Sequence, residues 1–334
     1  MSEDRVLITH GSGGALTRKL IEDTIAPVFN NEILAKFEDS SEIPGRSELV
    51  FTTDSHVVNP VFFPGGDIGR LSVSGTVNDI VTSGARPVAL SVGLIIEEGF
   101  PLKELKKILT SMKKTADEVP VQIITGDTKV VERGKCDGIY INTSGVGILE
   151  RGIKLSPYNI KPDDVVIISG PIGNHEASII AARNDLLPGV KINSDCAPLY
   201  DMMKNLIDEV PDTRCARDPT RGGLATTLIE LIESSGYGIE IFEEDIPVDN
   251  DVKDLCEILG MDPLFMANEG KMIIIVPKKN AENALEIIRK SKYGEKASII
   301  GRVHDKKARL TLKTVYGSTR VITMPAGSQL PRIC

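Results

Sequence analysis

Residues 51–85 read FTTDSHVVNPVFFPGGDIGRLSVSGTVNDIVTSGA, and this stretch decides the fold. It opens within a run of β-branched and aromatic residues, 48–58, which predicts a strand that stops at an acidic break. Apolar residues then recur at helical spacing from Ile68 to Val81, and Gly84 stands where a helix is expected to end. A strand followed directly by a helix indicates a mixed α/β protein.

The same alternation continues on both sides of a polar break at residues 150–164. We therefore predict an α/β fold with two mixed domains, 1–152 and 153–315, followed by a flexible tail, 316–334. The predicted strands are 48–58, 86–96, 121–131, 137–149, 164–170, 238–242, 270–277, 297–303 and 308–313, and the predicted helices are 68–84, 102–119, 175–184, 197–209, 223–234, 251–259 and 280–291.

Composition and charge exclude several classes of protein. The 334 residues carry a net charge of −8 and contain no Trp, which argues against a nucleic-acid or anionic membrane surface. The charged N-terminal stretch is not a secretory signal, and no apolar run approaches the roughly 20 residues of a membrane helix. The five cysteines are scattered without a CxxC pair, so we expect neither a disulfide framework nor a zinc site. We therefore expect a cytoplasmic protein with reduced cysteines.

Four aspartates follow apolar strands or stand at polar breaks. They are Asp54, Asp79, Asp127 and Asp218, each beside Gly, Thr, Asn or Pro. Clustered carboxylates suit a hard cation such as Mg²⁺, which usually shares phosphate oxygens and waters with one or two protein ligands. The alternative is that each aspartate is a turn or helix-cap residue.

Two glycine-rich segments, 9–14 and 219–223, precede predicted helices, so their N–H groups are placed to bind phosphate. Neither matches a P-loop or dinucleotide motif, and a plain helix entry is the alternative. Lys129 is suited to neutralising a phosphoryl group, unless it is a solvated surface lysine. Glu269 precedes an apolar strand and is either a general base or a turn residue. The four histidines are dispersed and indicate no triad.

Cys334 is the last residue of the sequence and follows Pro, Gly and Ser residues that do not pack. We expect a nucleophile displayed on an arm, since from Pro325 an extended chain reaches about 30 Å. Arg332 is expected to favour the thiolate. The alternative, an exposed cysteine without a role, is an oxidation liability.

The segments 51–85, TGDTKVV (125–131), RDPTRGGL (217–224), NEGK (268–271) and the final PRIC (331–334) together resemble one family over essentially the whole chain. The family is HypE, the hydrogenase maturation factors of the AIR synthase-related (PurM-like) ATP-binding superfamily. TTD, VND, GDT and NEG mark the superfamily, whereas the PRIC terminus is the specific part.

The resemblance implies an ATP-dependent carbamoyl dehydratase. A HypF-like carbamoyltransferase would load the terminal cysteine, and the thiocarboxamide would be dehydrated to a thiocyanate. Cyanide would then pass to iron on a HypC–HypD complex. The resemblance also implies a homodimer whose N-terminal sheets join across the two-fold axis, with ATP close to that interface. A non-enzymatic carrier, or another ATP-dependent enzyme on the same scaffold, remains the alternative.

The family pattern also assigns residues. It implies Mg²⁺ at the four aspartates, a phosphoryl-stabilising lysine, and a glycine-rich loop that closes over the phosphates. The expected catalytic residues are Cys334, Lys129, Glu269 and Asp79, and the expected nucleotide-binding residues are Gly11, Ser12, Gly13, Gly14, Thr53, Asp54, Asn78, Asp127, Thr128, Asp218 and Arg221.

Overall fold

A computed structural model describes residues 14–20, 22, 41–43, 48–149, 153–184, 192–305, 307–325 and 330–334. The expectations for Gly11, Ser12 and Gly13 fall outside these residues. None of the helices in the described part of the chain combines the length and the apolar character needed to span a membrane.

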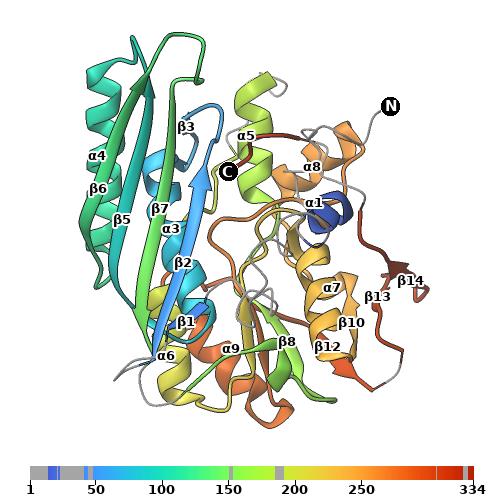
Figure 1. Ribbon diagram of the computed structural model, residues 1–334. Helices are drawn as coiled ribbons and strands as arrows, with labels where there is room; N and C mark the ends of the chain where they lie inside the picture. The colour runs from blue at the N-terminus through green and yellow to red at the C-terminus, as the bar shows by residue number, and fades with distance from the viewer. Residues whose placement is uncertain are drawn as a thin grey trace.

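The first domain is a five-stranded sheet with helices on one face (Figure 1). Its strand order is β1–β2–β7–β5–β6, and only β5 and β6 run parallel. Helix α4 makes the crossover that this parallel pair requires. The bounds are β1 Ser41–Ile43, β2 Leu49–His56, β7 Ile139–Ile148, β5 Arg86–Glu97, β6 Gln122–Val131, α3 Ile68–Thr82 and α4 Leu102–Asp117; α1 Ala15–Leu20 and the β3 Phe62–Phe63 and β4 Gly66–Asp67 ribbon lie outside the sheet.

The second domain is built on a seven-stranded sheet of order β14–β13–β10–β12–β8–β11–β9. Its strands are β8 Val165–Ile168, β9 Cys215–Arg217, β10 Gly238–Phe242, β11 Ile273–Val276, β12 Ser298–His304, β13 Leu310–Lys313 and β14 Thr319–Ile322. Its helices are α5 Asn174–Asn184, α6 Tyr200–Glu209, α7 Gly223–Ser235, α8 Asn250–Leu259 and α9 Ala281–Lys290, with short 3₁₀ turns between them.

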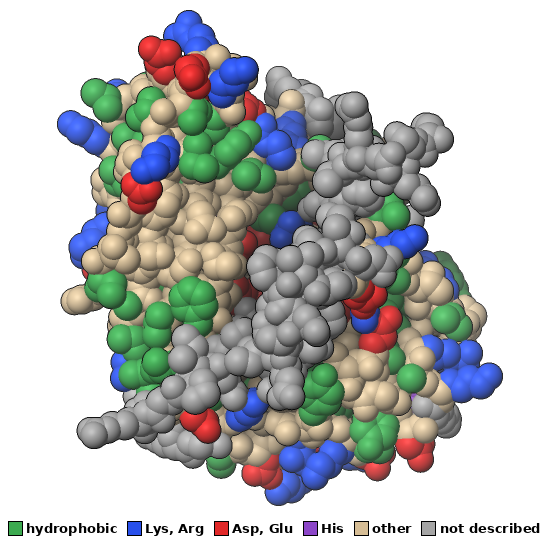
Figure 2. Space-filling view, viewed as in Figure 1, with side chains coloured by type: hydrophobic (Ala, Val, Ile, Leu, Met, Phe, Trp, Pro, Cys, Tyr) green, Lys and Arg blue, Asp and Glu red, His purple; other side chains and the backbone are tan. Residues whose placement is uncertain are grey.

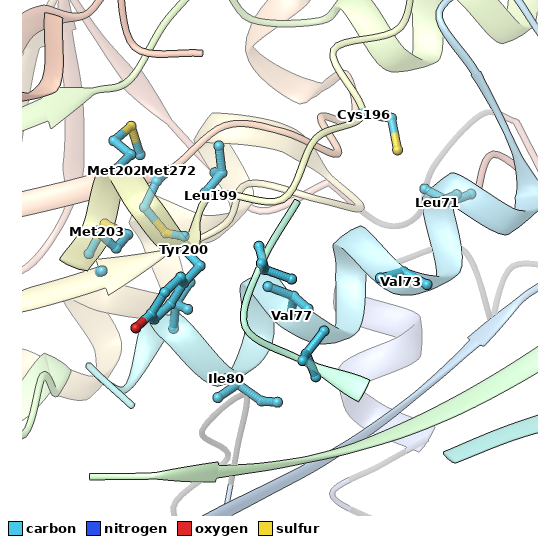
Figure 3. Packing of buried hydrophobic residues seen from close by; sticks show 14 of the residues in the cluster. Leu71, Val73, Val77, Ile80, Cys196, Leu199, Tyr200, Met202, Met203 and Met272 are labelled. Atoms are coloured by element: carbon cyan, nitrogen blue, oxygen red, sulfur yellow. The ribbon is translucent and has the colours of Figure 1, made fainter. Parts of the chain in front are cut away.

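Helix α3 lies between the two domains and is buried almost all round. Asp67 caps its N-terminus by accepting from the N–H groups of Gly69 and Arg70. The helix lies close on the sheet because Gly147 leaves room for Ile80, whose Cγ2 would be 2.4 Å from a Cβ at that position. Its apolar side chains pack against those of α6 and the segment before it, in one core shared by both domains (Figure 3).

Polar side chains of α3 also hold the segment 196–199 of the second domain. The Asn78 amide donates to the Ala197 carbonyl (3.0 Å) and accepts from the Leu199 N–H (2.9 Å). Arg70 donates from Nε to the Cys196 carbonyl at 2.8 Å. Since these bonds join backbone to buried side chains, they fix how the two domains meet.

The mixed α/β prediction is confirmed, and each predicted strand and helix has a counterpart. Strands β1, β3, β4, β9 and β14 were not predicted, because segments of two to four residues carry no readable alternation. Strand β14 pairs with β13 in antiparallel register, so the chain leaves the second sheet after Ile322 rather than at residue 315.

Candidate functional site

Strand β2 and helix α3 present two carboxylates on the helix-covered side of the first sheet. Along β2 the side chains of Thr52, Asp54 and His56 alternate with exposed ones, as a half-buried strand requires. Thr52 Oγ1 donates to Asp79 Oδ2 at 2.9 Å, and His56 Nε2 lies 3.3 Å from Asp54 Oδ2. Gly75 permits this arrangement, since a Cβ there would lie only 3.0 Å from Asp54 Oδ2. The two carboxylates therefore share one side of the sheet.

The second domain contributes Asp218, Arg221 and Glu269. Arg221 lies in the turn that leads into α7 and is accessible to solvent. Its pKa is raised by neighbours that are negative when ionised: the Cys334 sulfur first, followed by Asp54 and Glu269. Arg221 is therefore the cation around which groups from both domains and the C-terminus converge.

Glu269 is a carboxyl group of this cluster whose pKa is strongly perturbed. Burial is the first cause that raises its pKa well above the usual value, followed by the charges of Asp54, Asp218 and Asp195, while Arg221 opposes them. Burial and the neighbouring carboxylates therefore disfavour the ionised form of Glu269. Perturbed acids of this kind concentrate at functional sites.

Asp195 holds the loop that carries Glu269. Its buried carboxylate accepts from the N–H groups of Glu269 (3.3 Å) and Gly270 (3.1 Å), and Lys271 Nζ lies 3.4 Å away. Two backbone bonds and a buried counter-ion fix the carboxylate and the loop together. Sequence reasoning missed both residues: Asp195 belongs to no local motif, and Lys271 ends the NEGK segment but was given no role.

The last residues of the chain lie inside this site rather than on the surface. Figure 1 shows the C-terminus between the first sheet and helix α5. Ile333 is buried, and Cys334 packs against the main core. Burial first, then Glu269 and Asp54, raise the pKa of the thiol to about 12, against the opposing charge of Arg221. Cys334 is therefore a thiol at neutral pH, and its attraction to Arg221 arises only on deprotonation.

The expectation that Arg332 favours the thiolate is wrong. Arg332 points away from the sulfur: Nε donates to the Val57 carbonyl at 2.8 Å, and Nη1 pairs with Asp137. The nearby guanidinium is that of Arg221, which only the tertiary structure brings to the tail.

Asp127, Thr128 and Lys129 lie on the exposed edge strand β6. Across the sheet, Asp127 of β6 pairs with Gly93 of β5, Gly93 pairs with Asn142 of β7, and Asn142 pairs with Ser55 of β2. Paired residues on neighbouring strands point to the same face of a sheet. The Asp127 side chain therefore lies on the face of Ser55, opposite to that of Asp54. Lys129 is two residues further and lies on the same face, where its ammonium pairs with Asp127 at 2.7 Å. A single chain therefore does not bring Asp127 and Lys129 to Asp54 and Asp79.

Three other expected nucleotide-binding residues have different surroundings. Thr53 lies on the open face of the sheet, where its hydroxyl donates to the Thr143 carbonyl at 3.1 Å. The Asn78 amide is occupied by the backbone of the second domain, as described above. Gly14 precedes α1, and the next residue donates its N–H to the Pro325 carbonyl at 3.0 Å. None of these contacts leads into the acidic cluster.

The donor set fits a magnesium ion bound together with phosphates, not a closed protein cage. Among the residues described, no group of three or more His, Cys, Asp or Glu side chains is arranged to hold a metal. Asp54 and Asp79 supply carboxylate oxygens, and Mg²⁺ commonly uses one or two such ligands with substrate phosphates and waters. The four aspartate ligands that the sequence analysis expects are therefore more than one chain brings together.

We expect Asn78→Ala to lower the free energy of unfolding by about 2–4 kcal/mol, because it leaves the Ala197 carbonyl and the Leu199 N–H unsatisfied in a buried interface. Urea denaturation measures the change. The control Asn159→Ala removes an exposed amide and should cost less than about 1 kcal/mol. Unchanged stability with lost nucleotide binding would return Asn78 to the nucleotide site.

Two family models match the chain, and together they cover most of it. Residues 35–149 match the AIR synthase related protein N-terminal domain, and residues 161–313 match the corresponding C-terminal domain. The fold and the interdomain acidic site therefore define a two-domain protein of the AIR synthase-related class.

Comparison with relatives shows which family within this class the chain is similar to. The chain is 46% identical to the carbamoyl dehydratase HypE of Azotobacter vinelandii, over 98% of this chain and 97% of that protein. It is 40% identical to the Escherichia coli carbamoyl dehydratase HypE, over 99% and 100%. A solved HypE–HypF complex matches with a TM-score of 0.88 at 47% identity, covering 92% of this chain and 99% of that one, and a HypE structure in complex with ATP matches with 0.84 at 42%, covering 99% and 100%. The chain belongs to the HypE family of carbamoyl dehydratases.

Proposed function

We propose that this protein uses ATP to dehydrate an S-carbamoyl group on its own Cys334 to a thiocyanate, which supplies cyanide for the iron of a nickel–iron hydrogenase. The observation that carries the proposal is the position of the C-terminal residue. The Cys334 sulfur shares one electrostatic cluster with Arg221, Glu269 and Asp54, which come from both domains.

The reaction needs an oxygen to leave and two N–H protons to be removed. ATP would supply a phosphoryl group that turns the carboxamide oxygen into a leaving group, and Asp54 and Asp79 would hold Mg²⁺ with the phosphates. Positioning and charge neutralisation contribute most of such a transfer. Arg221 holds positive charge beside the sulfur and the developing phosphate charge.

Glu269 is the residue best placed to handle the protons. Its buried surroundings disfavour the ionised form, and positive charge brought close to it would favour the carboxylate that a general base requires. Asp195 keeps the loop fixed while this charge changes, through its two backbone bonds.

A homodimer explains the open face of the first sheet. Phe51 and Ile95 are exposed there, and Figure 2 shows uncharged polar side chains and backbone over its middle, with charged groups toward the margin. An uncovered sheet face of this kind suits a second copy of the same face. In the dimer, Asp127 and Lys129 would lie at the interface, where they can reach a nucleotide bound near it.

We expect Ile95→Asp to convert the dimer to a monomer and to lower turnover, because a charge would be buried at the joined faces. Analytical ultracentrifugation measures the first effect, and the dehydration rate measures the second. Ile258→Asp, on exposed α8, is the control. A dimeric Ile95→Asp protein would contradict the interface.

We also expect Lys129→Ala to slow turnover at least tenfold without monomerising the protein. The same two measurements apply to this variant. Wild-type turnover in Lys129→Ala would remove that lysine from the mechanism.

The proposed partners follow from the same chemistry in a cytoplasmic protein. A HypF-like carbamoyltransferase loads Cys334, and a HypC–HypD complex accepts the cyanide. The solved HypE–HypF complex supports the first partner. The second follows because the thiocyanate carbon has to reach iron before water attacks it.

Intact mass spectrometry tests the function directly. The protein carbamoylated on Cys334 is incubated with ATP and Mg²⁺, and its mass should fall by about 18 Da, one water. An unchanged mass would leave a carrier or scaffold, the alternative function. Omission of ATP is the matched control and should leave the mass unchanged.

A further inference from the structure

The C-terminal arm, residues 330–334, is bound mainly through its backbone. The Val57 N–H donates to the Cys334 carbonyl at 3.1 Å, and the Asn59 N–H donates to the Arg332 carbonyl at 3.3 Å. The arm thus lies along residues 57–59, just after strand β2. Arg332 has a φ of 58°, a conformation that residues other than glycine rarely adopt, so its surroundings have to hold it.

Two side chains of helix α5 close on the same arm. His175 Nε2 bonds to the Ile333 carbonyl at 2.8 Å. Arg183 donates from Nη1 to the Pro331 carbonyl at 3.0 Å and from Nη2 to the Arg332 carbonyl at 2.5 Å. The two residues lie eight positions apart, which places them on one side of the helix. Side chains of α5 therefore form hydrogen bonds with three successive carbonyls of the arm, those of residues 331–333.

The histidine is fixed by its surroundings. A carbonyl only accepts, so Nε2 carries the proton, and the neutral ring then accepts at Nδ1 from the Ser194 hydroxyl at 2.8 Å. The Ser194 hydroxyl in turn accepts from the Cys196 N–H at 3.1 Å. His175 is fully buried, with the Phe63 ring edge-on at 5.4 Å.

The same short segment also holds the proposed base. Ser194 orients His175, while its neighbour Asp195 binds the N–H groups of Glu269 and Gly270. The arm and the Glu269 loop are therefore both fixed to residues 194–196. A displacement of this segment would move both groups together.

We propose that His175 and Arg183 are positioning residues that hold the C-terminal arm by its carbonyls and thereby place Cys334 against Arg221 and Glu269. The proposal rests on the proposed function for its purpose, but its contacts do not involve the sulfur. We call His175 and Arg183 the clamp. Because the clamp binds only backbone oxygens of the arm, it can hold the arm in the same way whether Cys334 is a free thiol, is carbamoylated or carries the thiocyanate. Arg332 is the arm side chain that is bound in addition, by Val57 and Asp137.

Alkylation of Cys334 by a small maleimide tests the clamp without any turnover. Its rate is followed by the mass of the C-terminal peptide, in the full-length protein. We expect His175→Ala and Arg183→Met each to speed alkylation about tenfold or more, since loss of a buried or charge-assisted bond favours the released arm. His175→Gln keeps an N–H donor and should restore a rate close to wild type. Arg302→Met, which removes an exposed arginine paired with Glu240, is the matched control.

The outcomes separate the clamp from the reaction. Wild-type alkylation rates in both His175→Ala and Arg183→Met would overturn the clamp, whatever the dehydration rate. Faster alkylation, with rescue by His175→Gln, supports it even if the wild-type protein never dehydrates its carbamoyl group, a result that would defeat the proposed function alone. Should His175→Ala fail to fold, Arg183→Met decides, because Arg183 is only partly buried.

Discussion

Replacing Cys334 with alanine is expected to abolish dehydration while nucleotide binding remains. The sulfur is the only atom removed that would carry the carbamoyl group, and the substitution leaves Asp54, Asp79 and Arg221 in place. We expect no formation of thiocyanate and a dissociation constant for ATP within about threefold of the wild-type value. Intact mass after incubation with a carbamoyl-transferring partner measures the first quantity, and isothermal titration calorimetry measures the second.

The matched control is Cys136→Ala, which removes another partly exposed thiol. It should dehydrate at the wild-type rate, because the Cys136 sulfur donates to the Ile95 carbonyl of the first sheet and is not among the charges that act on Arg221 or Glu269. Full activity in Cys334→Ala would remove the terminal sulfur from the reaction. Loss of ATP binding in Cys334→Ala would show instead that the arm builds the nucleotide site.

Replacing Glu269 with glutamine should lower turnover by about 10²–10⁴ and at the same time stabilise the protein at neutral pH. The activity falls because the amide cannot accept the N–H protons. The stability rises because the wild-type carboxyl group is held, by burial and by Asp54 and Asp218, in an environment that disfavours its ionised form. Single-turnover rates measure the first effect, and thermal unfolding against pH measures the second.

The direction of the pH effect follows from proton linkage. The folded pKa of Glu269 lies well above 4.5, the value of an unperturbed glutamate side chain. Between these two values the folded protein keeps a proton that the unfolded chain releases, so stability falls as pH rises through that window. A glutamine side chain does not titrate, so Glu269→Gln does not lose stability in this pH window. The variant should therefore unfold at a higher temperature than wild type at about pH 7, and the two should converge near pH 4.

Glu286→Gln is the control for this pair of measurements. Glu286 is exposed and pairs with Lys290 on helix α9, so its removal should change neither turnover nor the pH profile appreciably. A Glu269→Gln protein with wild-type turnover would contradict the general-base role. A variant less stable than wild type at neutral pH would show that the carboxylate is stabilised rather than penalised by its surroundings.

Sequence patterns alone predicted most elements because they are long and periodic. Helix α4 and strand β5 carry clear apolar spacings that survive in any packing arrangement. The motifs at Asp54, Asp79, Arg221 and Glu269 lie on elements that the fold brings together, since Asp54 is on β2, Asp79 is on α3, Arg221 precedes α7 and Glu269 precedes β11. Their roles in catalysis remain predictions.

Other parts of the site had no local signal. Asp195, His175 and Arg183 act on segments more than 70 residues away in the chain, and nothing next to them marks those partners. Asp127 shows the converse. Its motif is readable, but the face of a strand on which it lies depends on register, and a shift of one residue reverses the face.

The amino-acid sequence by itself determined the alternation of strands and helices, the two-domain plan and the family motifs, because these depend on periodicity and on neighbouring residues. Only the tertiary structure decided that Cys334 lies docked beside Arg221 and Glu269, that Asp127 and Lys129 face away from them, and which residues hold the arm. These facts depend on contacts between distant segments and on strand register, and both are set by packing the whole chain into one core.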